Sequence, residues 1–188
     1  WIRAADYKRK LDKGETITRD LQLETLAGVL SGDILVHNHC YRADEMAQVI
    51  DMSKEFGYKV STFHHAVEAY KIADMLKDNN ICAAMWSDWW GFKMEGLDAI
   101  EANAALVDVP ANSCAVIHSD DPDLTRRLNQ GAAVSLAAGR EMGLNIPEER
   151  AISWFTLNAA RAIGIDKETG SLEVGKRADV VIWSADPL

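Results

Sequence analysis

All five histidines of the chain follow short apolar runs, and this placement constrains the fold more than any other feature of the sequence. The histidines are His37, His39, His64, His65 and His118. The runs before them have the length of strands, and patterns typical of helices follow them. In a parallel α/β sheet the carboxyl ends of all strands lie at one edge, where ligands bind. We therefore expect the five imidazoles to gather in one place.

Strand and helix patterns alternate through most of the chain. Strands are predicted over residues 33–39, 59–65, 81–86 and 113–119. A predicted helix follows each of them, over residues 43–56, 67–78, 97–107 and 123–142. Each crossover returns the chain to the same end of the sheet, so the four strands should run parallel. The expected fold class is therefore α/β.

Other patterns flank this alternating part. Two helices are predicted over residues 1–14 and 20–30. The tail differs in character, because turn residues and a strand predicted over 178–183 look like part of a β-rich unit. We therefore expect two units, one of residues 1–165 and one of residues 166–188.

Charge and hydropathy exclude several classes of partner. The formal net charge is −9, and no basic stripe could neutralise phosphates, so neither nucleic acid nor an anionic membrane is an expected partner. No run of about 18 apolar residues could span a bilayer, and the first residues lack the layout of a signal peptide. We therefore expect a cytoplasmic location.

The three cysteines give little sign of chemistry. Cys40, Cys82 and Cys114 are odd in number and widely spaced, which fits neither a disulfide framework nor a zinc knuckle. Reduced thiols in the core are expected, and no pattern marks one of them as a nucleophile.

Two histidine pairs are the first candidates for metal ligands. His37 and His39 share one face of their strand, so both could reach one ion. Two polar residues that merely end a strand are the alternative. His64 and His65 are adjacent, so we expect only one of them to face the interior while the other faces the helices.

One further histidine and an aspartate complete the candidate set. His118 and Asp120 share parity at the end of the fourth predicted strand. Imidazoles from three strands and one carboxylate suit Zn²⁺ or a similar divalent ion. Structural histidines would also be scattered over helices, so we favour a metal or catalytic cluster. Asp120 and Asp121 precede Pro122, and we expect one of them to cap the next helix.

The loop after the third strand has an unusual composition. It reads Ser87-Asp-Trp-Trp-Gly-Phe-Lys93 and should lie on the ligand side of the sheet. Asp88 and Trp89 could contact a substrate there, although a packed lid is equally compatible with this composition. Arg42, which closely follows the first strand, is the third candidate for contact with a small-molecule substrate.

Four segments of the chain recur in a known family. They are His39-Cys-Tyr-Arg-Ala-Asp-Glu45, Phe63-His-His-Ala-Val-Glu-Ala69, Ile117-His-Ser-Asp-Asp-Pro122 and Gly175-Lys-Arg-Ala-Asp-Val-Val-Ile-Trp183. In this order they resemble the amidohydrolase superfamily, and most of all its imidazolonepropionase-like branch. The resemblance implies a (β/α)₈ TIM barrel with a small β-sandwich. It also implies one or two divalent metals, Zn²⁺ first among them, that activate water.

The resemblance implies a role for each candidate. His39 resembles the metal ligand of the fifth barrel strand, with His37 as the less favoured choice, and His65 resembles the histidine of the sixth. Asp120 resembles the eighth-strand aspartate that touches the metal and moves a proton. His65 or His118 would polarise the substrate oxygen. The first-strand His-x-His and the fourth-strand ligand of the family are absent, so the chain resembles the C-terminal half of a barrel, strands five to eight.

The expected function is a metal-dependent hydrolase that cleaves a non-peptide C–N bond through a metal-activated water. One alternative is a catalytically incompetent barrel fragment with a structural or interaction role, and another is a metal-dependent barrel lyase or isomerase. An open sheet would expose an edge strand. We therefore expect a homo-oligomer or association with the missing N-terminal half.

Overall fold

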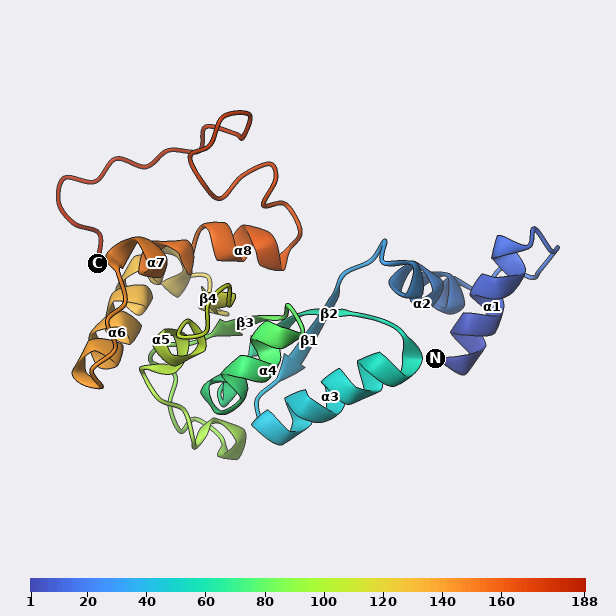
Figure 1. The fold of residues 1–188 in the computed structure, drawn as a ribbon, viewed down its shortest axis with the longest axis horizontal. Helices are drawn as coiled ribbons and strands as arrows, with labels where there is room; N and C mark the ends of the chain where they lie inside the picture. The colour runs from blue at the N-terminus through green and yellow to red at the C-terminus, as the bar shows by residue number, and fades with distance from the viewer.

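The computed structural model describes all 188 residues, and a four-stranded sheet lies at its centre (Figure 1). The strands lie side by side in the order β1-β2-β3-β4, and every neighbouring pair is parallel. Their bounds are β1 (Val36–Cys40), β2 (Val60–His65), β3 (Cys82–Met85) and β4 (Ala115–Ile117). The predicted parallel α/β arrangement is therefore confirmed, with strands that are shorter than predicted.

Helices precede the sheet, connect its strands and follow it. The α-helices are α1 (Ile2–Asp12), α2 (Leu21–Ser31), α3 (Ala43–Phe56), α4 (Ala73–Asp78), α5 (Asn103–Val107), α6 (Leu128–Glu141), α7 (Glu148–Ser153) and α8 (Leu157–Ala162). Three short 3₁₀ helices are η1 (Ala69–Ile72), η2 (Met94–Gly96) and η3 (Leu124–Arg127). None of the α-helices is both long enough and apolar enough to cross a bilayer.

The first two helices form a hairpin that projects from the sheet (Figure 1). The Asp20 side chain caps α2, because its Oδ1 accepts hydrogen bonds from the amides of Gln22 and Leu23 at 3.0 and 3.1 Å. Gly32 ends the helix with a left-handed φ of 80°. Both predicted helices are confirmed.

One helix is shorter than predicted because a buried asparagine organises the loops around it. The helix predicted over residues 97–107 begins only at Asn103. The Asn103 amide donates hydrogen bonds to the carbonyls of Ala66 and Val67 at 3.0 and 2.9 Å, and its oxygen accepts one from the Tyr70 amide. These bonds fix the end of β2 against the start of α5.

The main core lies between one face of the sheet and helices α3 to α6. Phe63 of β2, Met85 of β3 and Ile117 of β4 alternate with residues of the other face and are buried on this side. They pack against apolar side chains of the four helices, such as Met46 of α3 and Leu136 of α6. This core fixes the positions at which the strands end.

The other face of the sheet is covered only near the amino ends of its strands. Helix α8 lies there, and its Asn158 amide donates a hydrogen bond to the Ala115 carbonyl at 2.9 Å. The hydroxyls of Ser61 and Thr62 both donate to the Ala162 carbonyl, at 2.9 and 3.2 Å. The carboxyl ends of the strands, where the histidines lie, are therefore not covered by α8.

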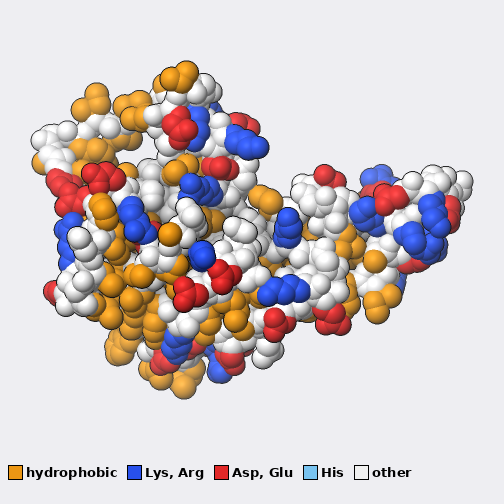
Figure 2. Space-filling view, viewed as in Figure 1, with side chains coloured by type: hydrophobic (Ala, Val, Ile, Leu, Met, Phe, Trp, Pro, Cys, Tyr) orange, Lys and Arg blue, Asp and Glu red, His pale blue; other side chains and the backbone are white.

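The prediction of a strand over residues 178–183 is wrong, because no strand forms after α8. The tail instead arches above α7 and α8 (Figure 1), and Figure 2 shows hydrophobic side chains on the surface in that region. Val181 is 71% exposed and Ile182 is 92% exposed. A strand needs a hydrogen-bonding neighbour, and the tail has none among these residues.

The prediction of reduced thiols is also wrong for two of the three cysteines. Cys82 and Cys114 form a disulfide. They precede Ala83 and Ala115, which are partners in the β3–β4 register, so their Cα atoms lie 4.5 Å apart although 32 residues separate them in sequence. Cys40 stays free and buried, and burial raises the pKa of its thiol to about 11, which makes it a poor nucleophile at neutral pH.

Candidate functional site

The structure brings the five histidines together: His39, His64, His65 and His118 lie at or directly after the carboxyl ends of β1, β2 and β4, and His37 is the second residue of β1. In the sheet register His39 lies opposite His64, which lies opposite Ala84 of β3. His118 directly follows β4. Each imidazole ring lies within 6 Å, centroid to centroid, of at least one other. We call His37, His39, His64, His65 and His118 the histidine cluster.

Two hydrogen bonds join imidazoles of neighbouring strands. His37 Nδ1 and His64 Nε2 lie 2.8 Å apart, and His39 Nδ1 and His65 Nε2 lie 2.6 Å apart. In each pair one ring must donate and the other accept, so both rings can be neutral. The two candidate ligands of the first strand therefore have different hydrogen-bond partners: His39 pairs with His65, and His37 pairs with His64.

Both histidines at the end of β2 belong to the cluster, so the expectation that one of them would face the helices is wrong. The ring of His64 lies 5.8 Å from that of His118, and the ring of His65 lies 5.3 Å from it. The reason is the backbone of His65, whose φ is 69°. A left-handed residue breaks the alternation of a strand, and such a conformation is costly for a residue with a Cβ.

The cluster contains unpartnered nitrogens that suit a cation. His65 Nδ1 and His118 Nε2 are buried and have no hydrogen-bond partner. Neutral imidazole nitrogens are ligands for Zn²⁺ and similar ions, so the donor chemistry fits a divalent metal. As the side chains stand, no three His, Cys, Asp or Glu side chains are arranged to hold an ion. The paired rings would have to separate to bind one.

Burial keeps these imidazoles neutral at physiological pH. It lowers the pKa of His65 to about 4 and that of His118 to about 3, and it also lowers the pKa of His64. Neighbouring imidazoles act in the same direction, whereas the negative charge of Asp120 opposes the shift in all three. Neutral rings are the form that can accept a metal or a proton.

The metal-free protein is therefore expected to lose stability as the pH falls through about 6.5, and to go on losing it until the pH reaches the folded-state pKa values of about 4 for His65 and about 3 for His118. In the unfolded chain the imidazoles take up protons near their ordinary pKa of 6.5, whereas His65 and His118 in the folded protein stay neutral to lower pH. The unfolded state thus binds more protons in this window, and protons favour it. Urea unfolding in the presence of EDTA measures the effect. His118→Asn should weaken the pH dependence, and a midpoint that does not change with pH would contradict the argument.

The two aspartates after β4 have different surroundings. Asp121 Oδ1 accepts hydrogen bonds from the amides of Asp123 and Leu124 at 2.8 and 2.9 Å, so it is the capping residue that the sequence predicted. Asp120 is exposed, has a φ of 52° and forms no hydrogen bond with a histidine. Its negative charge raises the pKa of His64, His65 and His118, against the larger effect of burial.

Aromatic side chains adjoin the histidine cluster. The Trp86 indole is buried and stacks on His65 and His118, with centroid distances of 4.4 and 5.2 Å. Its Nε1 donates a hydrogen bond to the Ser119 carbonyl at 3.1 Å, which fixes the ring. Tyr41, directly after β1, stacks on His65 at 5.0 Å. The cluster is therefore enclosed partly by rings, which lower the local dielectric constant.

The candidate substrate contacts of the third loop lie close to the cluster. Trp89 stacks on Trp86 at 4.9 Å. Asp88 is exposed and, with Trp89 and His118, lines a cleft of about 180 Å³ between this loop and the start of α6. The structure therefore brings Asp88 and Trp89 near His118.

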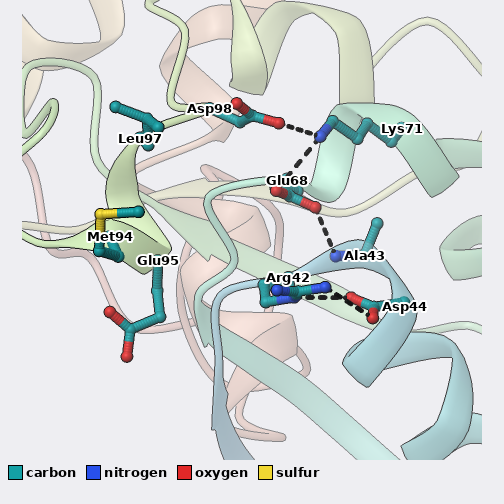
Figure 3. Close-up of a pocket in the computed structure, with 9 residues that line it drawn as sticks. All are labelled: Arg42, Ala43, Asp44, Glu68, Lys71, Met94, Glu95, Leu97 and Asp98. Carbon is teal, nitrogen blue, oxygen red and sulfur yellow. Dashed lines mark hydrogen bonds and ion pairs between the residues drawn. The ribbon is translucent and has the colours of Figure 1, made fainter.

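Arg42 lies elsewhere. Its guanidinium donates two hydrogen bonds of 2.9 Å to Asp44, and both residues line a pocket of about 600 Å³ outside the cluster (Figure 3). No histidine lines that pocket. Across it, Lys71 Nζ lies 2.6 Å from Asp98 and 3.2 Å from Glu68. The structure does not bring Arg42 together with the other candidates.

Tyr41, Trp86 and Lys93 also adjoin the cluster, and none of them was among the site residues predicted from the sequence. Tyr41 and Trp86 each directly follow a strand, which is the signal that could have identified them, since residues at that position lie at the ligand edge of the sheet. Lys93 closes the indole-rich loop, and its Nζ lies 3.9 Å from the centroid of the Tyr41 ring. The contact between Lys93 and Tyr41 joins two loops and could not be read from either alone.

Comparison with known proteins gives consistent results. The profile of the amidohydrolase family matches residues 9–188. The amidohydrolase tasK of Hapsidospora irregularis is 29% identical over 179 residues, which are 93% of this chain and 18% of that protein. The imidazolonepropionase of Alkaliphilus oremlandii is 24% identical, over 83% of this chain and 41% of its own length.

A solved structure shares the fold over almost the whole chain. The amidohydrolase from Thermotoga maritima superposes with a TM-score of 0.83 and 27% sequence identity, over 99% of this chain and 48% of that one. The chain thus spans less than half the length of each of these relatives. Since the family profile covers nearly all residues and includes every strand of the sheet, the chain belongs to the amidohydrolase family.

Proposed function

We propose that these residues belong to a metal-dependent hydrolase that cleaves a non-peptide C–N bond of a small molecule. One observation supports this most directly: the imidazoles of His65 and His118 lie 5.3 Å apart, centroid to centroid, and each has a buried nitrogen without a hydrogen-bond partner. Membership of the amidohydrolase family supports the reaction class.

The ligands we propose are His39, His65 and Asp120, with His37 as the alternative to His39. A divalent ion such as Zn²⁺ supplies a Lewis acid that lowers the pKa of water and polarises a carbonyl-like group. The left-handed backbone of His65 and Asp120 supports their selection, because strained residues gather at functional sites.

Two side chains carry out the proton transfer and stabilise the developing charge. A carboxylate oxygen of Asp120 takes the proton of the attacking water and returns it to the leaving nitrogen. The imidazole of His118, held by its stack on Trp86, donates a hydrogen bond to the substrate oxygen as negative charge develops there. Partial enclosure by rings strengthens both interactions.

A second part of this proposal concerns how the open four-stranded sheet is completed. Because the chain spans less than half the length of its relatives, we propose that the sheet is completed into a barrel by other residues of a longer protein or by a second copy of the chain. Strand β1 lies at an edge of the sheet and offers unpaired backbone groups for this.

Titration with Zn²⁺ tests the metal site. We expect the chain to bind Zn²⁺ stoichiometrically by calorimetry, and His65→Asn to weaken binding by at least about tenfold. A similar loss in His39→Asn, but not in His37→Asn, would identify the ligand of β1. Asn38→Ala is the matched control, because Asn38 lies between these two histidines on the opposite face of the strand.

The titration also separates the alternatives. No binding of Zn²⁺, or binding that His65→Asn leaves unchanged, would contradict the metal site. Either result would favour a structural role, in which the imidazole pairs His37–His64 and His39–His65 simply join β1 to β2.

A further inference from the structure

A buried asparagine supports the turn that follows β2. Asn103 is the first residue of α5 and is 2% exposed. Its amide nitrogen donates hydrogen bonds to the carbonyls of Ala66 and Val67 at 3.0 and 2.9 Å, and its oxygen accepts one from the Tyr70 amide at 3.0 Å. A carboxamide offers two donors and an acceptor, so both polar atoms of Asn103 are used by this turn.

The turn contains two consecutive residues with a left-handed backbone. The φ angle is 69° at His65 and 30° at Ala66. A Cβ atom makes this conformation costly, so it persists only where surrounding contacts hold it. The bonds from Asn103 reach the carbonyl of Ala66 itself and that of the next residue, Val67. They therefore act directly on the part of the chain that has to be held.

The same turn is also bonded to the loop after β1. The Glu68 amide donates a hydrogen bond to the Tyr41 carbonyl at 3.0 Å, and a Glu68 carboxylate oxygen accepts one from the Ala43 amide at 2.9 Å (Figure 3). These bonds set the loops after β1 and β2 relative to each other. Asn103 joins both loops to α5, a helix of the main core.

The conformation of His65 decides which imidazoles meet. In a regular strand adjacent side chains point to opposite faces, so only one of His64 and His65 would reach the cluster. The left-handed backbone brings both into it, and His65 Nε2 lies 2.6 Å from His39 Nδ1. Asn103 forms no hydrogen bond with these imidazoles. Its effect on them therefore passes through the backbone.

We propose that Asn103 is a positioning residue of the histidine cluster, which holds the left-handed backbone of His65 and Ala66 and so brings the imidazole of His65 to that of His39. This placement requires no metal. Its consequence for metal binding rests on the proposed hydrolase, in which His39 and His65 are ligands. A displaced His65 weakens binding there, although Asn103 itself is not a ligand.

The hydrogen bond between His39 and His65 gives a direct measurement. The ¹⁵N–¹⁵N coupling across this N–H···N bond is recorded by NMR on the chain labelled with ¹⁵N-histidine, in buffer with EDTA. We expect the coupling in the wild type and its loss in Asn103→Asp. Aspartate has nearly the same shape and keeps an acceptor for the Tyr70 amide, but as a carboxylate it has no donor for the two carbonyls.

A glycine separates positioning from a general loss of stability. Adding Ala66→Gly to Asn103→Asp should restore the coupling, because glycine adopts a positive φ at little cost and needs less support. A role of Asn103 in stability alone would not be repaired in this way.

Asn158→Asp is the matched control. Asn158 is 3% exposed, and its amide donates to the carbonyl of Ala115 at 2.9 Å, at the amino end of β4. We expect this variant to lower the midpoint of urea unfolding, as Asn103→Asp does, and to leave the coupling intact.

Titration with Zn²⁺ gives a second measurement on the same variants. Asn103→Asp should weaken binding by about tenfold, and the added Ala66→Gly should recover most of this loss. Asn158→Asp should bind Zn²⁺ like the wild type.

The NMR result decides the proposal. A coupling absent from the wild type, one that survives in Asn103→Asp, or a loss that Ala66→Gly does not repair would overturn it, and so would an equal loss in Asn158→Asp. If Asn103→Asp does not fold, Asn103→Ser, whose hydroxyl retains one donor, takes its place under the same criteria. If the coupling changes as expected but the wild type does not bind Zn²⁺, Asn103 still positions the cluster and the proposed hydrolase is wrong.

Discussion

Replacing Arg150 with methionine is expected to lower the free energy of unfolding by about 3–5 kcal/mol at neutral pH. Arg150 of α7 forms an ion pair of 2.8 Å with Asp108, which ends α5 and whose side chain is 5% exposed. Burial raises the pKa of Asp108, and the guanidinium opposes this. Without Arg150 the buried carboxylate has no counter-charge, which is the costly case. Urea unfolding measures the loss.

Two controls show whether burial is the cause. Asp108→Asn should cost less, because it leaves no buried charge and Arg150, whose side chain is 42% exposed, can be hydrated. Arg140→Met breaks an ion pair of 3.1 Å with Glu148, in which both side chains are about half exposed, and should cost less than about 1 kcal/mol. Equal losses in Arg140→Met and Arg150→Met would contradict the explanation.

For the proposed hydrolase, with the sheet completed into a barrel as proposed above, replacing Asp120 with asparagine is expected to lower kcat by about 10²–10⁴-fold. Asparagine has nearly the same shape and tolerates the left-handed backbone at this position, where φ is 52°. It cannot take up the proton of the attacking water. The substrate KM and the thermal midpoint should therefore change little, and steady-state kinetics of amine release would show the effect.

The neighbouring aspartate provides the matched control. Asp121→Asn keeps the oxygen that accepts the amides of Asp123 and Leu124, so the turn after β4 should survive and kcat should stay within about twofold of the wild type. If Asp121→Asn reduced kcat as much as Asp120→Asn, the proton transfer could not be assigned to Asp120.

Much of the fold could be predicted from local pattern. The run that leads into His64 and His65, for example, lies between a helix that ends at Gly57 and a second helical pattern. It forms β2, which is parallel to both of its neighbouring strands. The distinction between Asp120 and Asp121 was partly predictable, since one cap was expected. Such features depend on residues close together in sequence.

What the sequence could not predict depends on contacts between distant residues. The disulfide joins Cys82 to Cys114 because the β3–β4 register brings them together across a whole crossover. Residues 178–183 have the composition of a strand, but a strand also requires a neighbour. The position of Lys93 over Tyr41 depends on how two loops meet.

The left-handed conformation of His65 has a consequence for protein engineering. An ordinary strand directs adjacent side chains to opposite sides, so grafting the same histidines onto another parallel sheet would turn one imidazole toward the helices. A designer who wished to reproduce the cluster would have to copy the turn at the end of β2 together with the side chains. The chemical identity of the residues alone would give an incomplete copy.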